Sequence, residues 1–477
     1  MLRAIVSKEI HDNLLNLRFS VGFVLCVVIT VSCLMILTHD YSQELRDYNL
    51  RVLMQEEFLS KYAHTNRMGG MLDPQQPPEV FRPLIIGIPR DADLGSFDDN
   101  PLPAIFPPLD LLFVVTVIMS LLAILFSYDA VAGERESGTL KLMASNSLSR
   151  AKILLGKWLG GSVSLLIPFV FSILAGVLYI MLQPDIHWDS SSWAAFSLLV
   201  LASVLFISLF YLLGLLVSAW SRLATVSILS SIFLWVVLIL VIPNLSPYLA
   251  AQLYRVPSVN KIERETHSIT GIERDDLGRK LSDEVRKKFE RQYGQVFNDY
   301  LALSKEELLR RAAADPEFKA MIDAYRAENR QAWDEANRVQ REKAEKIYNE
   351  LILRAQRQTT LAKRLSCLSP YADYVYVATD LSGTGLRSLD YFSRISQEYY
   401  GVLWQYLEKK SELARKKDPT FNENSFLDVS DRPRFQYIEE PLKERISGGL
   451  LYWGVLLFFN VVLFAAAFVR FIKYDVR

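Results

Sequence analysis

A short stretch of charged residues and glycines, residues 129–157, holds the side chains whose types and spacing best suit a specific task. Acidic residues at the start of a short helix suit the positive end of the helix dipole. Charged residues beside a small apolar patch favour docking of another protein, because the patch packs and the charges fix the register. A solvated, positively charged loop is the alternative interpretation. The candidate docking residues are Gly133, Glu134, Arg135, Glu136, Gly138, Thr139 and Leu140.

Catalytic chemistry is not indicated by any motif. The sequence contains no GxxxxGK[ST] loop, no HExxH pair and no GxSxG elbow, and the dipeptide Gly156-Lys157 is followed by a tryptophan. The three cysteines show neither a disulfide framework nor zinc spacing. We therefore expect no catalytic residue, no metal site and no cofactor in this chain. A net charge of zero makes no case for nucleic acid as a partner.

Six apolar runs of about 20 residues predict membrane-spanning helices. None of them carries an acidic or basic residue at mid-membrane depth, which argues against a proton-coupled or ion-coupled carrier and for energy supplied from outside the membrane part. We expect Gly133 to end or kink the second helix, and Pro243 and Pro247 to break the fifth. The predicted spans are Phe19–Thr38, Ile105–Tyr128, Trp158–Leu182, Trp193–Trp220, Ala224–Ile242 and Leu450–Phe471.

The distribution of arginine and lysine predicts the orientation. Residues 1–18, the loop 129–157, the turn at Arg222 and the tail 472–477 are basic and fall on one side of six spans. Both termini are therefore expected in the cytoplasm, with the chain crossing the membrane several times. The helical spacing of apolar residues in 1–18 favours an interfacial helix lying on the inner leaflet.

Two segments, 39–104 and 243–449, are then extracytoplasmic. The first is expected to be loop, with helix possible at Tyr41–Ala63 and one short strand at Pro83–Ile88. In the second, Glu317–Ser366 predicts one long helix, with Asp283–Leu303 as its antiparallel partner. Leu368–Leu386 either returns the chain to the outer membrane surface or forms a turn packed under the helical domain. The predicted fold is an all-α membrane protein with a large, mostly helical outer domain.

The sequence GERESGTL, followed by SNSLSRAKILLGK, resembles the signature of type-2 ABC exporter permeases. The resemblance implies that residues 133–139 form a cytoplasmic coupling helix that contacts a nucleotide-binding subunit. The long first outer loop and the insertion before the last span resemble a subgroup often grouped with copper-enzyme-maturation or gliding-motility permeases, although no Met- or His-rich copper motif is present. Further positions that match the same block of the family pattern are Ser149, Arg150, Leu155, Gly156 and Lys157.

The resemblance implies the membrane subunit of an ATP-driven exporter. A separate cytoplasmic P-loop ATPase would bind ATP and magnesium, and a second permease, identical or similar, would complete the assembly in the bilayer. Two alternatives stay open. In the first, the outer helical domain does mechanical work and no substrate crosses. In the second, the chain is a membrane-anchored scaffold.

Overall fold

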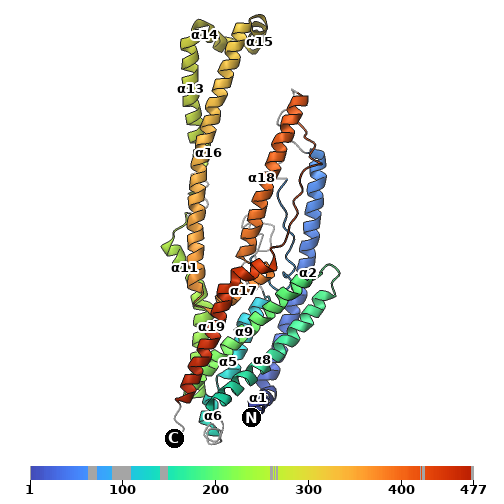
Figure 1. The fold of residues 1–477 in the computed structure, drawn as a ribbon, viewed down its shortest axis with the longest axis vertical. Helices are drawn as coiled ribbons and strands as arrows, with labels where there is room; N and C mark the ends of the chain where they lie inside the picture. The colour runs from blue at the N-terminus through green and yellow to red at the C-terminus, as the bar shows by residue number, and fades with distance from the viewer. Residues whose placement is uncertain are drawn as a thin grey trace. The chain divides into compact units, whose positions relative to one another are not determined.

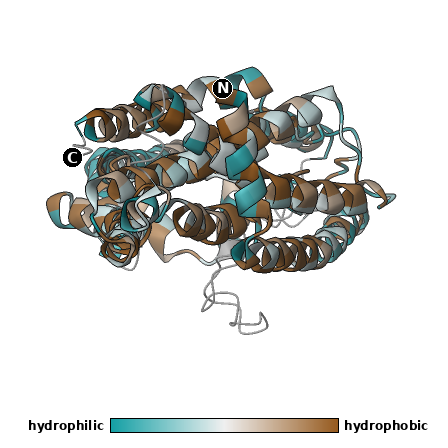
Figure 2. Ribbon diagram, turned by 90° about the horizontal axis from the view of Figure 1, so that it is seen from below, coloured by the Kyte–Doolittle hydropathy of each residue, from teal (hydrophilic) through white to brown (hydrophobic). Residues whose placement is uncertain are grey.

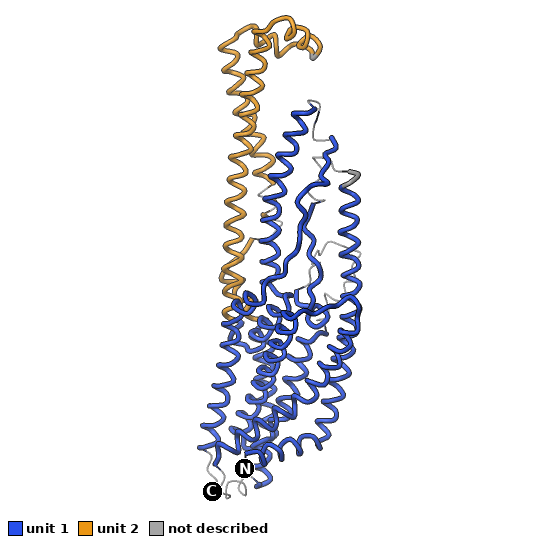
Figure 3. The backbone as a smooth tube through the Cα atoms, turned by 45° about the vertical axis from the view of Figure 1, so that its right-hand side comes forward, with its two compact units in different colours: residues 1–243, 366–477 blue, residues 244–365 orange. Residues whose placement is uncertain are grey.

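Helices make up nearly all of the computed structural model, and no β-strand occurs among the residues it describes. Those residues are 2–62, 72–88, 109–139, 149–257, 261, 262, 264, 267–418, 421 and 425–473. The chain divides into two compact units, Met1–Pro243 with Ser366–Arg477, and Asn244–Leu365 (Figure 3). The all-α fold class predicted from the sequence is confirmed.

Six helical segments are long and apolar enough to cross a membrane. Four are single α-helices, and hydrophobic residues cover much of the helical surface of the chain (Figure 2). The second and fifth each contain a π-helical stretch. In chain order the segments are α2 (Leu17–Tyr62), α4–η2–α5 (Leu111–Phe113, Val114–Met119 and Ser120–Ser127), α8 (Arg150–Met181), α9 (Ser190–Trp220), α10–η3–α11 (Ala224–Val236, Val237–Val241 and Ile242–Leu253) and α19 (Leu442–Ile472).

The first span is part of a much longer helix than its apolar run. Helix α2 has 46 residues and continues without interruption through the polar stretch that follows the run (Figure 1). Near its far end, Leu59 is buried together with Leu403 and Leu407 of α18 (Leu386–Lys417) and with Leu427. This satellite core stabilises the helical conformation of the polar end of α2, because it buries apolar side chains in a region that lies beyond the apolar run.

The second span begins where a buried aspartate caps it. The carboxylate of Asp110 accepts hydrogen bonds from the backbone N–H groups of Phe113 at 3.0 Å and Ile86 at 3.2 Å. Burial raises the pKa of Asp110 to about 6, although these backbone donors oppose the shift. The first part of the predicted span, residues 105–108, lies outside the described residues.

The strand expected at Pro83–Ile88 is wrong. Residues 80–84 form a turn, and no neighbouring strand is present among the described residues. The N–H of Ile86 goes to the Asp110 carboxylate, and that of Ile88 goes to the carbonyl of Thr384 at 3.0 Å. Gly87 has a φ of +65°. The N–H groups of Ile86 and Ile88 thus each donate to a separate acceptor, rather than forming the regular hydrogen bonds of a β-sheet.

Helix α9 lies at the centre of the first unit. It packs against α5, α10, α19 and α17 (Pro370–Ser382), and most of its middle and C-terminal residues are buried. Tyr211 and Phe206 are almost completely covered. A helix that is apolar on all sides and surrounded by other helices forms the core of such a bundle.

Helix α17 corrects the expectation for Leu368–Leu386. The sequence predicted a return of the chain to the outer membrane surface or a turn packed under the helical domain. In place of the turn the chain forms a helix that packs against α9 and α19, and the return to the membrane surface stays a prediction. Ser369 caps its start by accepting from the N–H of Tyr371 at 3.2 Å, and Gly383, with a φ of +73°, ends it. The buried Tyr374 hydroxyl shares a hydrogen bond of 2.8 Å with Ser203 Oγ on α9.

The proline at 243 does not break the fifth helix as predicted. Pro243 and Pro247 both lie within α11, and the five residues that precede this helix, η3, are π-helical. In a π-helix the carbonyl of Leu238 would accept from residue 243, which has no N–H. The hydroxyl of Ser369 donates to that carbonyl instead. A side chain from another element therefore supplies the hydrogen bond that the proline removes.

The second unit is built around a helical hairpin. Four helices, α13 (Arg274–Tyr293), α14 (Gln295–Ala302), α15 (Lys305–Ala314) and α16 (Pro316–Ser366), follow the short π-helix η4 (Ser268–Glu273). Helix α13 runs antiparallel to α16, since Gly278 lies against Trp333 and Lys288 Nζ donates to Glu328. The predicted long helix and its antiparallel pairing are confirmed.

The partner of α16 is broken at Gly294, which has a φ of +54°. The break separates α13 from α14 and lets the ring of Phe297 turn back onto Phe289 and Tyr325. Phe318, Met321 and the rings of Phe289 and Phe297 are buried together. The second unit thus has a hydrophobic core of its own.

Candidate functional site

The candidate site is the place where three helices meet around one buried lysine. They are α1 (Leu2–Leu14), the short helix α6 (Ala132–Glu136), and the first turns of α8. The chain leaves α5 at Ser127 and turns over residues 128–131 before α6 begins. The break therefore precedes Gly133, which lies inside α6 rather than at the end of the span as expected.

The start of α6 is held by a side chain from α9. Ser218 Oγ is fully buried and accepts hydrogen bonds from the backbone N–H groups of Val131 and Ala132, each at 3.0 Å. The first N–H groups of a helix have no partner within the helix, so Ser218 replaces the cap that the local sequence does not supply.

Lys157 is the centre of the site. Only 1% of its side chain is exposed, and its Nζ donates to Glu134 Oε1 on α6 at 2.7 Å and to Glu9 Oε1 on α1 at 3.0 Å. The hydroxyl of Tyr211 donates to the Lys157 carbonyl at 3.1 Å. A buried ammonium group is stable only when it is paired. We call Glu9, Lys157 and Glu134 the ion-paired junction, since it ties α1, α6 and α8 together.

Two glycines of α8 bring α1 close enough for this pairing. A Cβ atom at Gly156 would lie 2.5 Å from Ile5, and one at Gly160 would lie 2.6 Å from Glu9. Side chains at these positions would push α1 away from α8. The position of Gly156 in the resembling motif thus has a physical basis, which is helix crossing at short distance.

The other charged residues of α6 bind the turn between α9 and α10. Arg135 donates to the carbonyl of Ser221 at 2.7 Å, and Glu136 Oε1 accepts from the N–H of Ala224 at 2.8 Å. These bonds satisfy a carbonyl after the end of α9 and an N–H at the start of α10. Glu134 and Arg135 therefore point into the protein, whereas Glu136 is exposed.

The C-terminal tip of α6 lies at the surface. Glu136, Ser137, Gly138 and Thr139 are all exposed, and Gly138 has a φ of +75° with open space around its Cα. The hydroxyls of Ser137 and Thr139 share a hydrogen bond of 2.9 Å. We call residues 136–139 the exposed tip. Leu140, the last predicted docking residue, lies outside the described residues.

Further contacts surround the junction. Arg150 donates to the carbonyl of Ile472 at the end of α19, and Ser149 precedes α8 without a side-chain cap. Arg18 at the start of α2 pairs with Asp129 at 2.8 Å and with the hydroxyl of Tyr128 at 2.9 Å. The structure therefore brings Glu134, Gly156 and Lys157 together, leaves Thr139 at the surface, and connects Arg150 to another helix.

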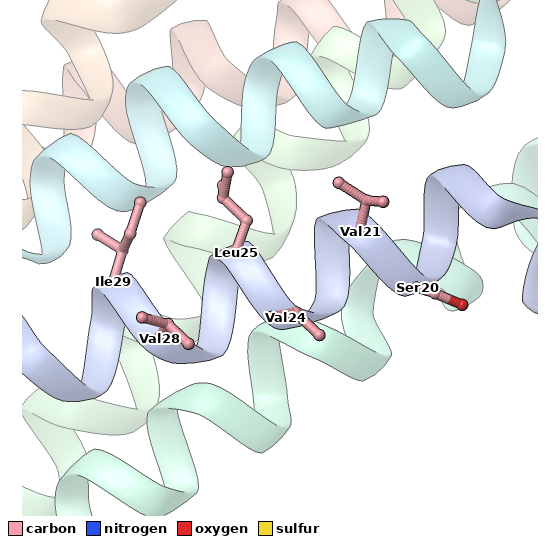
Figure 4. Close-up of a pocket in the computed structure, with 6 residues that line it drawn as sticks. All are labelled: Ser20, Val21, Val24, Leu25, Val28 and Ile29. Atoms are coloured by element: carbon pink, nitrogen blue, oxygen red, sulfur yellow. The ribbon is translucent and has the colours of Figure 1, made fainter.

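The membrane-facing side of the first unit is apolar. A shallow hollow runs along α2 and is lined by Ser20, Val21, Val24, Leu25, Val28 and Ile29 (Figure 4). A second hollow, of about 290 Å³, lies between α2, α5 and α10 and includes Leu25, Leu121 and Ile232. Such surfaces suit lipid chains or another apolar helix.

Comparison with known proteins adds the family. Over 111 residues, 23% of this chain, the sequence is 34% identical to a probable ABC transporter permease protein NosY of Pseudomonas aeruginosa, and the match covers 40% of that protein. Over 83 residues it is 40% identical to a probable permease NosY of Stutzerimonas stutzeri, covering 17% of this chain and 29% of the relative. The chain thus spans less than half the length of these relatives.

The family model described as ABC-2 family transporter protein matches residues 3–476. That range includes all six candidate spans, the ion-paired junction and the second unit. The chain therefore belongs to the ABC-2 transporter family, and its six candidate spans make it a multi-pass membrane protein.

Proposed function

We propose that the chain is the permease of an ATP-driven exporter and that a separate P-loop ATPase docks on the exposed tip, residues 136–139. The ion-paired junction carries the proposal. A force on the tip reaches Glu134 within the same helix, and Lys157 connects Glu134 to α8 and, through Glu9, to α1. Because α6 has only five residues and is bonded at both ends, it moves as one body with its partners.

The proposed orientation places α1, α6 and both termini in the cytoplasm of a bacterial cell. The basic residues near this end, Arg18, Arg135, Arg150, Lys152, Arg222 and Arg470, support it through the positive-inside preference. Closure of the ATPase subunits on ATP and magnesium would then move α6, α1 and α8 together. A second permease in the same membrane, with its apolar hollows facing the first copy, would complete the transport path.

Thr139→Trp tests the docking surface. Among the described residues, the hydroxyl of the exposed Thr139 bonds Ser137 and the carbonyl of Glu134, both close in sequence. A bulky ring at this position should therefore block a partner without disturbing the spans. We expect the bound ATPase to fall about tenfold or more, as for a central interface residue. The measurement is purification from native membranes, with mass spectrometry to identify any chain that carries a GxxxxGK[ST] loop.

Lys473→Trp is the matched control, because Lys473 is exposed just after α19 and is not in the tip. Both variants should keep the thermal unfolding midpoint of the wild type. Equal ATPase recovery with Thr139→Trp and Lys473→Trp would contradict docking at the tip.

The separate core of the second unit favours a second candidate, in which this unit does mechanical work and no substrate crosses. Ser282 and Asn329 are hydrogen-bonded at 2.5 Å across the hairpin. Residues 283–328 can therefore be replaced by a short Gly-Ser linker, which keeps this hydrogen bond and the pairing of the helix segments before residue 283 and after residue 328. An exporter should still complement a strain that lacks the chain, whereas a mechanical subunit should not. Both trimmed and intact chains should retain the ATPase.

A further inference from the structure

Asp373 is a buried acidic residue that the proposed transport cycle does not use. It lies in the first turn of α17, is completely buried, and belongs to the helix that packs against α9 and α19. Within the part of the chain that the structure describes, neither carboxylate oxygen meets a nitrogen or oxygen hydrogen-bond partner. The thiol of Cys367, just before α17, is the sulfur group that faces it.

No positive charge compensates Asp373 from the elements around it. The titratable side chains near it are the phenols of Tyr376 on its own helix and Tyr452 on α19, whose rings are 4.8 Å apart, and the carboxylate of Asp380. Around the next residue, Tyr374, the polar groups are Ser203 of α9, which shares a hydrogen bond with its hydroxyl, and the carboxylate of Asp110, which precedes α4. Among the described residues, the environment is therefore apolar, phenolic or acidic.

An unpaired carboxylate in such surroundings is costly, and the group avoids the cost by binding a proton. The positive end of α17 favours the charged form, but this effect is weaker than the loss of hydration for a fully buried group. We propose that Asp373 is a proton-binding site: the folded chain holds its carboxyl group as the neutral acid, and release of that proton to the solvent weakens the packing of α17 on α9 and α19.

The electrostatics agree with this geometry. Burial raises the pKa of Asp373 from its ordinary value of 3.8 to about 7, although the Cys367 thiol opposes the shift. Burial and the neighbouring Asp373 raise the pKa of Cys367 to about 12. Because the folded pKa of the acid lies above the unfolded one, the packing is at full strength below about pH 4 and is lost as the pH rises through about 7.

Two hydrogen bonds near the start of α17 anchor it to the membrane spans, and both lie close to Asp373. Ser369 supplies the hydrogen bond that Pro243 removes from the fifth span, and Tyr374 bonds Ser203 in the middle of α9. Both anchors flank Asp373 within four residues. The ionisation state of Asp373 thus controls a contact between α17 and two membrane spans, independently of what the transporter carries.

Infrared difference spectroscopy on the full chain in lipid nanodiscs tests the protonation directly. Between about pH 5 and about pH 9 the wild type should lose a carboxylic-acid C=O band with a midpoint of about 7, and Asp373→Asn should lack that band. Asp390→Asn, at an exposed position on α18, is the control and should keep it. A wild-type spectrum with no band removed by Asp373→Asn would overturn the proposal.

The thermal unfolding midpoint measures the effect on packing. It should fall in the wild type as the pH rises through about 7, and Asp373→Asn should flatten this fall, leaving the separate contribution of Asp110. The shift of about three pKa units corresponds to about a thousandfold change in the folding equilibrium. An identical pH dependence in the wild type and Asp373→Asn would refute the packing role.

A second variant keeps the test decisive if Asp373→Asn does not fold. Cys367→Ala removes the thiol that lowers the pKa of Asp373, and it leaves the carboxyl group in place. We expect the midpoint of the infrared band to move to higher pH in this variant. A midpoint near the ordinary aspartate value of 3.8, in the wild type or in Cys367→Ala, would exclude a proton held at neutral pH.

Discussion

Lys157→Met should destabilise the protein by about 3–5 kcal/mol, because it leaves the carboxylates of Glu9 and Glu134 facing each other without their shared cation. Met has nearly the same length as the lysine stem, so the change isolates the loss of charge. The thermal unfolding midpoint in detergent measures the effect. A purified complex, if it forms, should show ATP hydrolysis that no longer responds to the membrane subunit.

Two comparisons separate the junction from a general effect of losing a lysine. Lys152→Met alters an exposed residue on the same helix and should behave like the wild type. The triple variant Glu9→Gln, Glu134→Gln, Lys157→Met carries no buried charge and should recover much of the stability, since removing a whole buried ion cluster costs less than removing one partner. Equal stability of Lys157→Met and Lys152→Met would rule out the ion-paired junction.

Gly161→Leu is expected to have the second large effect. A Cβ at Gly161 would overlap the hydroxyl and ring of Tyr211, which is almost completely buried and bonds the Lys157 carbonyl. Overpacking of this kind costs about 1–3 kcal/mol, and a leucine against a fully enclosed ring falls at the upper end. The yield of folded protein and its thermal midpoint are the measurements.

Gly454→Leu on α19 is the matched control, since nothing lies within 4 Å of a Cβ placed there. It introduces the same side chain into another membrane-spanning helix without a clash. In the double variant Gly161→Leu, Tyr211→Ala the space vacated by the ring should recover part of the loss, which a double-mutant cycle detects as coupling. Additive losses would show that the two residues do not meet.

The features that were predicted from sequence are those encoded locally. Uninterrupted apolar runs identify spans because a charge is costly in hydrocarbon, and the stripe from Phe318 to Leu351 predicts the long helix α16 from its period alone. A short helix was also predicted to begin near Glu134 and Glu136; the helix is present, but it begins at Ala132 and Glu136 is its last residue. These inferences needed no knowledge of which segments meet.

The role of Lys157 could not be found in this way, because it depends on α1 crossing α8. In the sequence Lys157 counted only as a basic loop residue and as a position of the family pattern, and nothing connected it to Glu9. The spacing of Gly156 and Gly160 was an available signal, since small residues four apart mark close helix crossings. Ile5 and Glu9 are also four apart on α1, so the carboxylate shares a face with the residue that meets Gly156.

The passage through Pro243 was mispredicted because it depends on a residue that is distant in the sequence. A proline has no backbone N–H, so one carbonyl of the preceding turn loses its hydrogen-bond donor. The helix is expected to break there only if that carbonyl finds no other donor. Here Ser369, which is 131 residues from Leu238 in the sequence, donates to the carbonyl of Leu238. The sequence around Pro243 and the sequence around Ser369 do not show this hydrogen bond when each is considered alone, because it depends on the tertiary fold.

The length of α2 makes it a lever arm. Its 46 residues span roughly 69 Å, more than twice the thickness of a bilayer core of about 30 Å. A tilt of about 10° around the end at Arg18, where the helix is tied to Asp129, would sweep the other end through roughly 12 Å. Because Leu59 packs against Leu403 and Leu407 of α18, this movement would also displace α18, far from the end of α2 at Arg18.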